Sequence, residues 1–494
     1  MKFIPPMHLK DGYKVGHPFQ YPADTTLVNS NWTPRTSRIP SVDKVLVFGP
    51  QYFVKEYLQD QWGRNFFDKP RQQVVDKYNR RIKNYLGAAV PIDHVEALHK
   101  VGYLPLRLKA LREGTLCPLR VPVLTVQNTQ DHAYWLTNMI ETLMSNVLWL
   151  PMTSATTAYG YRKRFMRAAQ LTGVPSEFTK WQGHDFSMRG LPGLEAACMS
   201  GAAHLLSFYG TDTIPAIDWL EEYYGADSDK ELVGGSVPAT EHSVMSVAGK
   251  QDELETFRRL ITEVYPTGIV SIVSDTWDFW KVLTEYLPQL RDTILARDGK
   301  VVIRPDSGDP VKIICGDPDA AEGSPERKGA IRVLYEIFGG PLSSTGFQHL
   351  DPHIGLIYGD SITPDRQTEI LSGLMSKGFT SDVTVLGIGS FTYQYVTRDT
   401  YGFAMKATYA ERTSVGGVDI WKDPKTDNGM KKSATGRLSV TLDEYGKLVL
   451  LEKCSAVEER AGLLQTIFED GLEHNVTTLA EIREQVEANL LKEV

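Results

Sequence analysis

Arg304, Asp306 and Gly308 stand directly behind a run of β-branched residues, 301–303, in a segment that ends at Pro310. The apolar run predicts a strand buried in a parallel sheet. An arginine can donate two hydrogen bonds to a phosphate, and an aspartate can accept from ribose hydroxyls or enter a metal shell. Parallel α/β enzymes place such groups at the carboxyl ends of strands. A solvated loop with a surface ion pair is the competing interpretation of this motif alone.

The same order of strand, polar residues and helix occurs three more times. The further apolar runs are 269–273, 354–358 and 383–386. The residues that follow them are Ser274, Asp275 and Asp278; Gly359, Asp360 and Ser361; and Gly387, Gly389 and Ser390. Helical spacing of apolar residues predicts helices at 277–286 and 364–377. The repeats predict a parallel βα array with an active site on one rim. Four units leave open whether the array closes into a barrel.

Length and composition describe an ordinary globular chain. At about 150 residues per domain, 494 residues predict two or three domains. A net charge of -8 argues against a nucleic-acid-binding protein. No signal peptide core and no run of about 20 apolar residues occur, so we expect no membrane segment. The four cysteines are scattered without a zinc-ligand spacing, which predicts reduced thiols in the cytoplasm and neither structural zinc nor disulfides.

The C-terminal part of the chain has a different pattern from the array. Apolar residues alternate over 438–442 and recur at 448–450, which predicts two antiparallel strands joined by a turn at 443–446. The N-terminal third also mixes strands with helices. We therefore predict a discontinuous α+β domain made from both chain ends, beside the βα array. The expected divisions are residues 1–150, 151–384 and 385–494.

Two motifs carry residues suited to a flat polar ligand. Within 184–190, Phe186 can stack on a ring and Arg189 can hold an anion ahead of a helix start. For this motif alone, a core-filling phenylalanine and a surface arginine are the more common interpretation. Within 210–213, Asp212 can bind an amide or amine, or it can cap the helix that follows.

Two further motifs suit phosphate chemistry. Glu241 and His242 stand together ahead of Ser243, and this imidazole can carry a proton, bind a metal or accept a phosphate, or it can be structural. A basic set in the C-terminal part can neutralise a polyphosphate, or it can be a solvated face. Its members are Arg398, Lys406, Lys422, Lys425, Lys431, Lys432 and Arg437.

Taken together, the motifs resemble those of the nicotinamide phosphoribosyltransferase family in order and spacing. They are 184–190, 210–213, 236–243, 274–278, 303–310 and 359–360, with further matches at 11–14, 20–22, 134–142, 422–424 and 436–438. The resemblance implies the α/β fold of type II phosphoribosyltransferases, an irregular βα barrel packed on a discontinuous α+β domain. It implies transfer of a 5-phosphoribosyl group from phosphoribosyl pyrophosphate to nicotinamide in NAD salvage. It also implies Mg²⁺, ATP hydrolysis coupled through a phosphohistidine, and a homodimer with shared active sites.

The resemblance assigns the nicotinamide site to five positions. Phe186 would stack on one face of the ring, and Tyr13 would reach the other face from the partner subunit, with Asp11 close by. Asp212 would accept a hydrogen bond from the carboxamide. Arg189 would be one of the residues that hold the amide, the phosphates and the ribose.

It assigns the phosphoribosyl and nucleotide sites in the same way. Arg304 and Asp306 would hold phosphates and ribose. The catalytic set would also include Asp278 and His242, the residue that ATP phosphorylates, with Glu241 orienting its imidazole. Gly359, Asp360, Gly389 and Ser390 would seat the ribose and 5′-phosphate, Arg398 would bind phosphate, and Arg35, Lys406, Lys422 and Lys431 would surround the diphosphate and nucleotide.

The chain departs from the family pattern at several places. Ser390 and Phe391 replace glycines of the animal enzymes, and Gly355 replaces an arginine near the substrate tunnel. Ala434 and Thr435 replace two lysines, and the charged segment 317–328 is an insertion. These differences bear on affinity.

Two alternative functions stay open beside the first. Nicotinate phosphoribosyltransferase shares fold and reaction, and Asp212 argues against it because a carboxylate repels nicotinate. A non-catalytic relative that only binds ligands or partner proteins is disfavoured by the filled catalytic positions.

Overall fold

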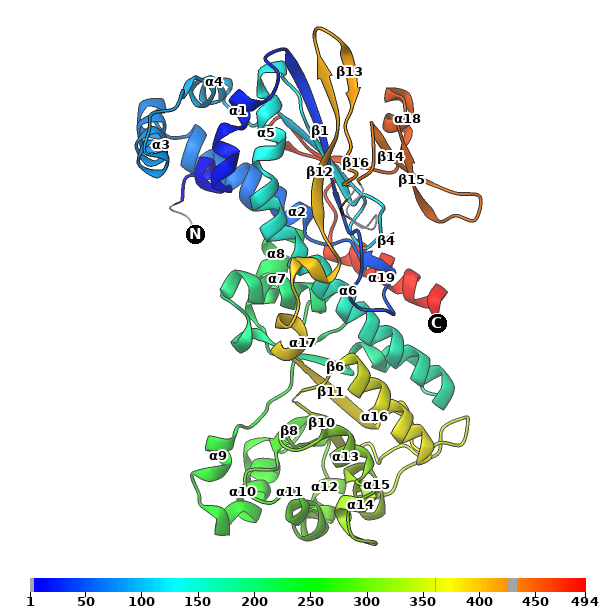
Figure 1. Ribbon diagram of the computed structural model, residues 1–494. Coiled ribbons are helices and arrows are strands. Elements are labelled where there is room, and N and C mark those ends of the chain that lie inside the picture. The colour runs from blue at the N-terminus through cyan, green and yellow to red at the C-terminus, as the bar shows by residue number, and fades with distance from the viewer. Residues whose placement is uncertain (1–3, 360, 425, 427–432) are drawn as a thin grey trace. The chain divides into compact units, whose positions relative to one another are not determined.

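The computed structural model describes residues 4–359, 361–424, 426 and 433–494 (Figure 1). The chain forms two compact units. Unit 1 comprises Met1–Thr156, Glu222–Gly225 and Val396–Val486, and unit 2 comprises Thr157–Glu221, Ala226–Tyr395 and Glu487–Val494. The division expected after residue 384 does not coincide with a boundary between the two units. Thr384 begins strand β11 (Thr384–Gly389), which lies wholly in unit 2.

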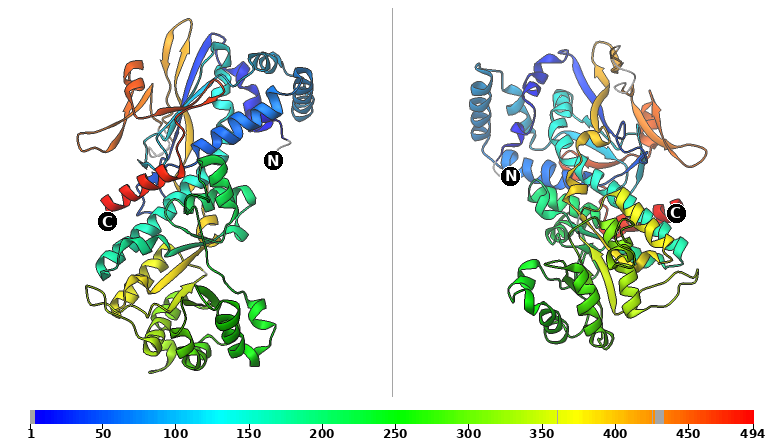
Figure 2. Two further views of the ribbon diagram at one scale, coloured as in Figure 1. Left: turned by 180° about the vertical axis from the view of Figure 1, so that it is seen from behind. Right: turned by 60° about the horizontal axis from the view of Figure 1, so that its bottom comes forward.

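Unit 1 is built on a seven-stranded antiparallel sheet with the order β13-β12-β1-β5-β3-β16-β17. Its strands are β1 (Thr25–Thr33), β3 (Leu106–Ala110), β5 (Leu124–Asn128), β12 (Ala404–Arg412), β13 (Gly416–Asp419), β16 (Gln465–Glu469) and β17 (Leu472–Glu473). The long strands β1 and β12 run side by side in Figures 1 and 2. In β3, Leu106, Leu108 and Ala110 are buried while the residues between them are half-buried, as alternation predicts.

Two small sheets complete the strands of unit 1. The pair β2 (Lys44–Leu46) and β4 (Leu116–Pro118) is antiparallel. The predicted C-terminal hairpin is confirmed as β14 (Leu438–Leu442) and β15 (Leu448–Glu452). Its turn is closed by a hydrogen bond of 2.8 Å from Asp443 N to Lys447 O.

The helices of unit 1 are short or amphipathic. They are α1 (His17–Gln20), α2 (Pro50–Tyr52), α3 (Arg71–Leu86), α4 (Asp93–Val101), α5 (Tyr134–Met139) and α18 (Ala456–Ala461). Helix α3 buries Val74, Tyr78 and Ile82, which are spaced on one helical face. It ends at Gly87, whose φ of 72° suits glycine.

Unit 2 is built on a six-stranded parallel sheet with the order β7-β6-β11-β10-β9-β8. Beside β11, its strands are β6 (Gly183–Phe186), β7 (Gly210–Thr211), β8 (Val270–Val273), β9 (Val301–Arg304) and β10 (Ile354–Tyr358). The four strands predicted from apolar runs are confirmed as β8 to β11. They lie next to one another in the sheet, so their polar carboxyl ends share one rim (Figure 1).

Residues 235–240 close this sheet into an irregular barrel. They form parallel bridges to both edge strands, Gly235 to Gly210 of β7 and Ala239 to Ser271 of β8. The backbone hydrogen bonds are Thr211 N to Gly235 O at 3.0 Å, Ser271 N to Pro238 O at 2.8 Å and Thr240 N to Ser271 O at 3.0 Å. The question of closure, which the sequence left open, is answered by this segment.

Helices cover the outward-facing side chains of the barrel strands. The helices of unit 2, or shared with unit 1, are α6 (Glu141–Thr172), α7 (Leu194–His204), α8 (Pro215–Tyr224), α9 (His242–Ser246), α10 (Glu253–Arg259), α11 (Phe279–Lys281), α12 (Leu287–Leu295), α13 (Pro310–Cys315), α14 (Pro325–Lys328), α15 (Ala330–Phe338), α16 (Pro364–Ser376), α17 (Ser390–Gln394) and α19 (Leu479–Glu493). Val301, Ile303 and Leu356 belong to one buried core with residues of α12, α15 and α16. The predicted helix at 364–377 is confirmed as α16.

Two expectations about the whole chain can be compared with the structure. Among the described residues, no helix has the length and apolar character needed to cross a membrane. All four cysteines are buried free thiols. Burial raises the pKa of Cys315 to about 12, so this thiol stays protonated near neutral pH.

Candidate active site

The barrel of unit 2 encloses a channel of about 420 Å³. Side chains at alternating strand positions line this channel. Examples are Val302 and Arg304 in β9 and Lys300, the residue just before β9. The intervening Val301 and Ile303 face the helices and are fully buried. The interior of this barrel is therefore a cavity. In many other βα barrels, side chains fill this space.

One part of the channel wall forms around the aromatic ring of Phe186. His184 and Phe186 lie on the same face of β6, with ring centroids 4.5 Å apart. His184 Nε2 lies 2.8 Å from Asp212 Oδ1, and Ser236 Oγ donates to the same oxygen at 3.0 Å. Burial alone would raise the pKa of Asp212, but the contacts with His184 and Ser236 outweigh it and lower that pKa. Asp212 is therefore an ionised acceptor beside an aromatic face.

Two glycines leave the space that the Phe186 ring occupies. A Cβ atom on Gly387 would lie 2.5 Å from Phe186 Cδ2. A Cβ atom on Gly359 would lie 2.7 Å from Asp306 Oδ1 and 3.7 Å from Phe186 Cε2. The absence of side chains at these strand ends brings the ring and the Asp306 carboxylate close together.

His242 lies among three polar side chains at the rim of the barrel. It is the first residue of α9, two positions after the closing segment 235–240. Its Nδ1 lies 3.0 Å from Thr276 Oγ1. Its Nε2 lies 4.0 Å from Asp275 Oδ1 and 3.9 Å from Asp306 Oδ2. The second ring nitrogen thus faces two carboxylates.

Asp275 is the functional candidate to which sequence reasoning gave no role. Its side chain is only 4% exposed. Oδ2 accepts hydrogen bonds from Asp306 N at 2.9 Å and Ser307 Oγ at 2.6 Å. Oδ1 accepts none from the described residues and faces His242. The structure singles it out through strand register: β8 and β9 pair Val273 with Arg304, and Asp275 and Asp306 each stand two residues beyond that pair.

Arg304 connects the channel with the carboxylates. It lines the channel, and its Nη2 donates to the carbonyl oxygen of Thr240 in the closing segment. Its Nε lies 3.8 Å from Asp306 Oδ1. The structure therefore brings Arg304, Asp306 and His242 together.

Two expected members of this group lie differently. Glu241 stands at the N-cap position of α9 without a side-chain capping hydrogen bond, and its carboxylate accepts from the Ser243 hydroxyl. The side chain that contacts the His242 imidazole is Thr276. Asp278 caps α11 by accepting from Lys281 N at 3.0 Å. The Asp278 carboxylate is therefore used at a helix start, which is a common role of aspartate there.

The remaining residues expected in unit 2 lie at the rim. Arg189 is exposed in the turn at 188–190. A Cβ atom on Gly190 would lie 2.1 Å from Ser390 Oγ, so this turn touches the start of α17. Gly389 ends β11 with open space around it. Asp360 and Lys431 lie outside the described residues.

The expected residues near the N-terminus belong to unit 1. The Asp11 carboxylate accepts a hydrogen bond from Thr142 Oγ1 at 2.8 Å. The buried Lys14 ammonium lies 2.6 Å from Glu141 Oε2 and donates to Asn138 O at 2.8 Å. Tyr13 stands between these two anchors and is 64% exposed. The hydrogen bond of Asp11 and the ion pair of Lys14 thus fix the backbone on both sides of Tyr13, while the tyrosine side chain stays exposed to solvent.

Unit 1 also contains a basic pocket of about 520 Å³, which Arg35, Arg120 and Lys406 line. Arg35 Nε donates to Gly402 O at 3.0 Å. Burial, with the neighbouring charges of Arg35, Lys422 and Arg398, lowers the pKa of Lys406 against the opposing effect of Glu141. Lys406 therefore lies near Arg35, Lys422 and Arg398 in unit 1. Arg437, also expected in the basic set, is instead paired with Glu411 and Glu459.

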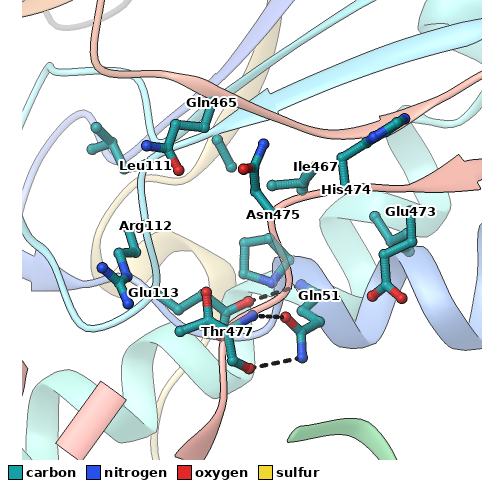
Figure 3. A pocket seen from close by; sticks show the side chains of 13 residues that line it. Gln51, Leu111, Arg112, Glu113, Gln465, Ile467, Glu473, His474, Asn475 and Thr477 are labelled. Atoms are coloured by element: carbon teal, nitrogen blue, oxygen red, sulfur yellow. Dashed lines mark hydrogen bonds between the residues drawn. The ribbon is translucent and has the colours of Figure 1, made fainter. Parts of the chain in front are cut away.

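A much smaller pocket of about 20 Å³ lies elsewhere in unit 1 (Figure 3). Thr477 N donates to Gln51 Oε1 at 2.7 Å, and Gln51 Nε2 donates to Thr477 O at 3.0 Å. Glu113 lies beside them, and its carboxylate accepts from Gly49 N at 3.1 Å and Gln51 N at 2.8 Å. Because these groups satisfy one another, this pocket is structural.

Comparisons with known proteins agree with this geometry. The family model of the nicotinate phosphoribosyltransferase (NAPRTase) family matches residues 181–489, and that of the nicotinamide phosphoribosyltransferase N-terminal domain matches residues 7–98. The nicotinamide phosphoribosyltransferase of Acinetobacter baylyi is 50% identical over 499 aligned residues, with 99% of this chain and 98% of that protein covered. That of Xanthomonas campestris pv. campestris is 31% identical, with 97% of each chain covered.

Solved structures share the fold at low identity. The nicotinate-nucleotide pyrophosphorylase of Pyrococcus furiosus aligns with a TM-score of 0.58 at 14% identity, covering 98% of this chain and 95% of that one. Human nicotinic acid phosphoribosyltransferase aligns with a TM-score of 0.51 at 16% identity, covering 98% and 94%. The chain has the type II phosphoribosyltransferase fold, and it belongs to the nicotinate phosphoribosyltransferase family, in its nicotinamide phosphoribosyltransferase branch.

Proposed function

We propose that the protein transfers the 5-phosphoribosyl group from phosphoribosyl pyrophosphate to nicotinamide, giving nicotinamide mononucleotide and pyrophosphate in NAD salvage. The observation that carries this proposal is the arrangement of the channel mouth. An aromatic face at Phe186 and an ionised acceptor at Asp212 lie in the same channel as Arg304, which neighbours Asp306. The full-length relatives named for this activity support the same conclusion.

The chemistry asks for positioning and charge stabilisation. As pyrophosphate leaves, C1 of the ribose gains positive charge and the leaving group gains negative charge. Asp306 can face the cationic centre, and Arg304 can stabilise the phosphates. The pyridine nitrogen carries no proton when it attacks, so no general base is needed. Phe186 and Asp212 orient the ring for that attack.

Magnesium fits this site as a partner of substrate phosphates. The described residues contain no cluster of three or more His, Cys, Asp or Glu side chains that would hold a metal alone. Mg²⁺ commonly binds through one or two carboxylates together with phosphates and waters. Asp275 Oδ1, which accepts no hydrogen bond from the described residues, and Asp306 are the groups suited to it. Bound Mg²⁺ would neutralise charge on the departing pyrophosphate.

The direct test is a product assay with each pyridine substrate. Purified protein, phosphoribosyl pyrophosphate and Mg²⁺ should convert nicotinamide to its mononucleotide much faster than nicotinate. Faster conversion of nicotinate would support the nicotinate phosphoribosyltransferase alternative. No conversion of either substrate by folded protein would support a non-catalytic relative.

Asp212 is proposed to set the preference for the amide. Its ionised carboxylate accepts from an amide N–H and repels the carboxylate of nicotinate. Two like charges about 4 Å apart repel by about 4 kcal/mol at an effective dielectric constant of about 20, which corresponds to roughly a thousandfold preference. The Asp212→Asn variant should narrow the ratio of the two rates. An unchanged ratio would assign the discrimination to another group.

His242 is proposed to accept a phosphoryl group from ATP. With Nδ1 near Thr276, the nitrogen that faces Asp275 and Asp306 can attack the γ-phosphate. The γ-phosphorus bond to the bridging oxygen breaks, ADP leaves, and later hydrolysis returns the imidazole and phosphate. The phosphohistidine would add negative charge that organises Mg²⁺ and basic residues around the sugar donor.

The His242→Ala variant tests this coupling. It should lose substrate-stimulated ATP hydrolysis and keep slow nucleotide synthesis at high donor concentration. Intact ATP hydrolysis in this variant would contradict the proposal. Loss of ATP-independent synthesis in folded protein would place His242 in the glycosyl transfer itself.

A cytoplasmic homodimer with shared active sites completes the proposal. Tyr13 is exposed between the anchored residues Asp11 and Lys14, which supports a role of its ring in the active site of the partner subunit. The basic pocket with Arg35 and Lys406 supports diphosphate and nucleotide binding, and the buried free thiols support a reducing compartment. Mixing Tyr13→Ala and Asp306→Ala chains should restore activity through hybrid sites. Heterodimers that form but have no activity would contradict the proposal that the two subunits share their active sites.

A further inference from the structure

Asp185 is a buried carboxyl group behind the channel wall, and no step of the proposed reaction uses it. It stands between His184 and Phe186 in β6, and its side chain is fully buried. Because neighbours in a strand point to opposite faces, Asp185 faces away from the channel that His184 and Phe186 line. A carboxyl group in such a position is stable only where hydrogen bonds satisfy its oxygens.

The first oxygen of Asp185 holds the segment of Phe186. Oδ1 accepts hydrogen bonds from Ser187 N at 2.9 Å and from Ser187 Oγ at 2.6 Å. A bond from an aspartate to the backbone N–H two residues on is an Asx turn, and Phe186 is the residue that this turn encloses. Oδ1 therefore fixes the backbone that carries the aromatic ring and leads into the turn at 188–190.

The second oxygen holds the segment of Asp212. Oδ2 accepts from Thr213 Oγ1 at 2.7 Å and from Thr211 Oγ1 at 3.4 Å. These two threonines flank Asp212, and Thr213 N donates to Thr211 Oγ1 at 3.0 Å. Asp212 N donates to the backbone oxygen of Asp185 at 2.9 Å. The side chain and the backbone of Asp185 thus fix the Asp212 turn together.

The packing around this carboxylate leaves it little room to move. A Cβ atom on Gly201 of α7 would lie 3.3 Å from Asp185 Oδ2 and 3.0 Å from Thr213 Cγ2. Ser187 and Thr213 are fully buried, so water does not replace their hydroxyls. One buried side chain therefore connects the segment of the aromatic ring with the segment of the amide acceptor.

We propose that Asp185 is a positioning residue for amide selectivity, which holds Phe186 and Asp212 at the separation that nicotinamide needs without touching the substrate. A ring stacked on Phe186 meets the Asp212 carboxylate with its amide N–H only if the two segments keep their spacing. When the Oδ2 side is loosened, the Asp212 carboxylate moves, which weakens the bond to the amide and the repulsion of nicotinate together. The inference rests on the proposed function in taking nicotinamide as the ring bound there.

The first test removes one hydroxyl from the Oδ2 side. Thr213→Val keeps the shape of the side chain and loses the bond to Asp185. The ratio of kcat/KM for nicotinamide to that for nicotinate should fall about tenfold, since a displacement of about 1 Å can cost about a hundredfold. KM for nicotinamide should rise, and KM for phosphoribosyl pyrophosphate should stay unchanged. Thr213→Ser keeps the hydroxyl and should keep the ratio of the parent protein.

A variant on the Oδ1 side and a control separate positioning from stability. Ser187→Ala should raise KM for both pyridines by a similar factor, because Phe186 stacks on the ring that they share, and should leave the ratio unchanged. Thr256→Val removes a buried hydroxyl of α10 that donates to Asp252 O at 3.0 Å. This control should lower stability without changing either KM or the ratio.

Asp185→Asn connects the threonine contacts with the aspartate itself. Ser187 N can only donate, so the amide oxygen should stay on that side and the NH2 group should face Thr211 and Thr213. The charge-assisted contact becomes a weaker neutral one, so this variant should also lower the ratio. Because Asp185 and Thr213 act through one contact, the double variant should lower the ratio by less than the product of the single effects. Effects that multiply would show independent action and overturn the inference.

Two further results would overturn it. One is an unchanged ratio in folded Thr213→Val, and the other is an equal fall of the ratio in the control Thr256→Val. If Thr213→Val does not fold, Thr211→Val removes the longer bond to the same oxygen and takes its place. An unchanged ratio in that variant has the same meaning.

Failure of this inference and failure of the proposed function have different signatures. Calorimetry measures the affinity of the parent protein and its variants for the two pyridines independently of turnover. Parent protein that makes nicotinamide mononucleotide, with a preference that no variant changes, contradicts the positioning role alone. Parent protein that makes no mononucleotide, with a binding preference that Thr213→Val reduces, contradicts the proposed activity alone.

Discussion

Glu113 in unit 1 and Asp275 in unit 2 are both almost fully buried carboxylates, yet their surroundings differ. Each oxygen of Glu113 accepts a backbone N–H, from Gly49 or Gln51, and the Tyr224 hydroxyl adds a further contact. Asp275 has one oxygen that accepts two hydrogen bonds and a second that accepts none from the described residues. That second oxygen faces His242 at 4.0 Å.

The difference separates a carboxylate that holds the fold from one prepared for chemistry. Buried polar atoms normally find partners, so a buried acceptor without one calls for an explanation. At Glu113 the explanation is complete, because the neighbouring backbone uses both oxygens. At Asp275 the acceptor that has no partner among the described residues faces the imidazole, and a donated proton or a cation is what such an oxygen can bind. Mutations should therefore affect stability in one place and catalysis in the other.

The largest expected effect is that of Asp275→Asn on ATP hydrolysis. The amide oxygen can keep the bonds from Asp306 N and Ser307, while the amide nitrogen points a donor, without negative charge, at His242. Loss of this charge should lower ATP hydrolysis about a thousandfold, within the usual range for groups that assist proton transfer. Thermal unfolding should change little. A variant with normal ATP hydrolysis would show that the free oxygen has no role in this step.

Glu113, the structural carboxylate of the comparison, should make the free energy of unfolding depend on pH. Burial raises the pKa of Glu113 from 4.5 to about 7, so the folded state binds this proton more tightly. Its contribution is fully present below the unfolded pKa and is lost as pH rises through about 7. The loss is of the order of 3 kcal/mol for this group. Urea unfolding at a series of pH values should show the decline.

Glu113→Gln is expected to lower stability by a smaller amount. One of the two backbone N–H groups would then face an amide nitrogen that cannot accept, at a cost of about 2 kcal/mol. The variant should also lose the part of the pH dependence that Glu113 causes. Its turnover, measured where it is fully folded, should match that of the parent protein. Altered turnover would mean that Glu113 is linked to catalysis after all.

The carboxylates of Asp275 and Asp278 show how far the sequence alone could lead. Apolar runs identified β8 to β11, and the polar residues behind them identified the rim, because strand pattern is a local property. The choice between Asp275 and Asp278 depended on the pairing of Val273 with Arg304, which no local pattern encodes. Asp278 has a local function at a helix start, and it was therefore the more conspicuous but less central residue.

The closing segment was unpredictable for a related reason. Residues 235–240 read Gly-Ser-Val-Pro-Ala-Thr, without the apolar run that predicts a buried strand. They nevertheless bridge β7 and β8 because the edges of the sheet offer free backbone groups. The position of His242 at the rim follows from this bridge. The contact of its ring with Thr276, in place of the expected Glu241, follows from it too.

The smallest expected effect is that of Ser307→Ala, which removes one of the two hydrogen bonds to Asp275 Oδ2. The other bond, from Asp306 N, remains and keeps the carboxylate oriented. Because Ser307 is exposed, water can replace its hydroxyl, so stability should fall by no more than about 1 kcal/mol. ATP hydrolysis should fall only a few-fold, since the free oxygen still faces His242. A loss as large as in Asp275→Asn would mean that orientation by Ser307, and not the charge on Asp275, prepares the imidazole.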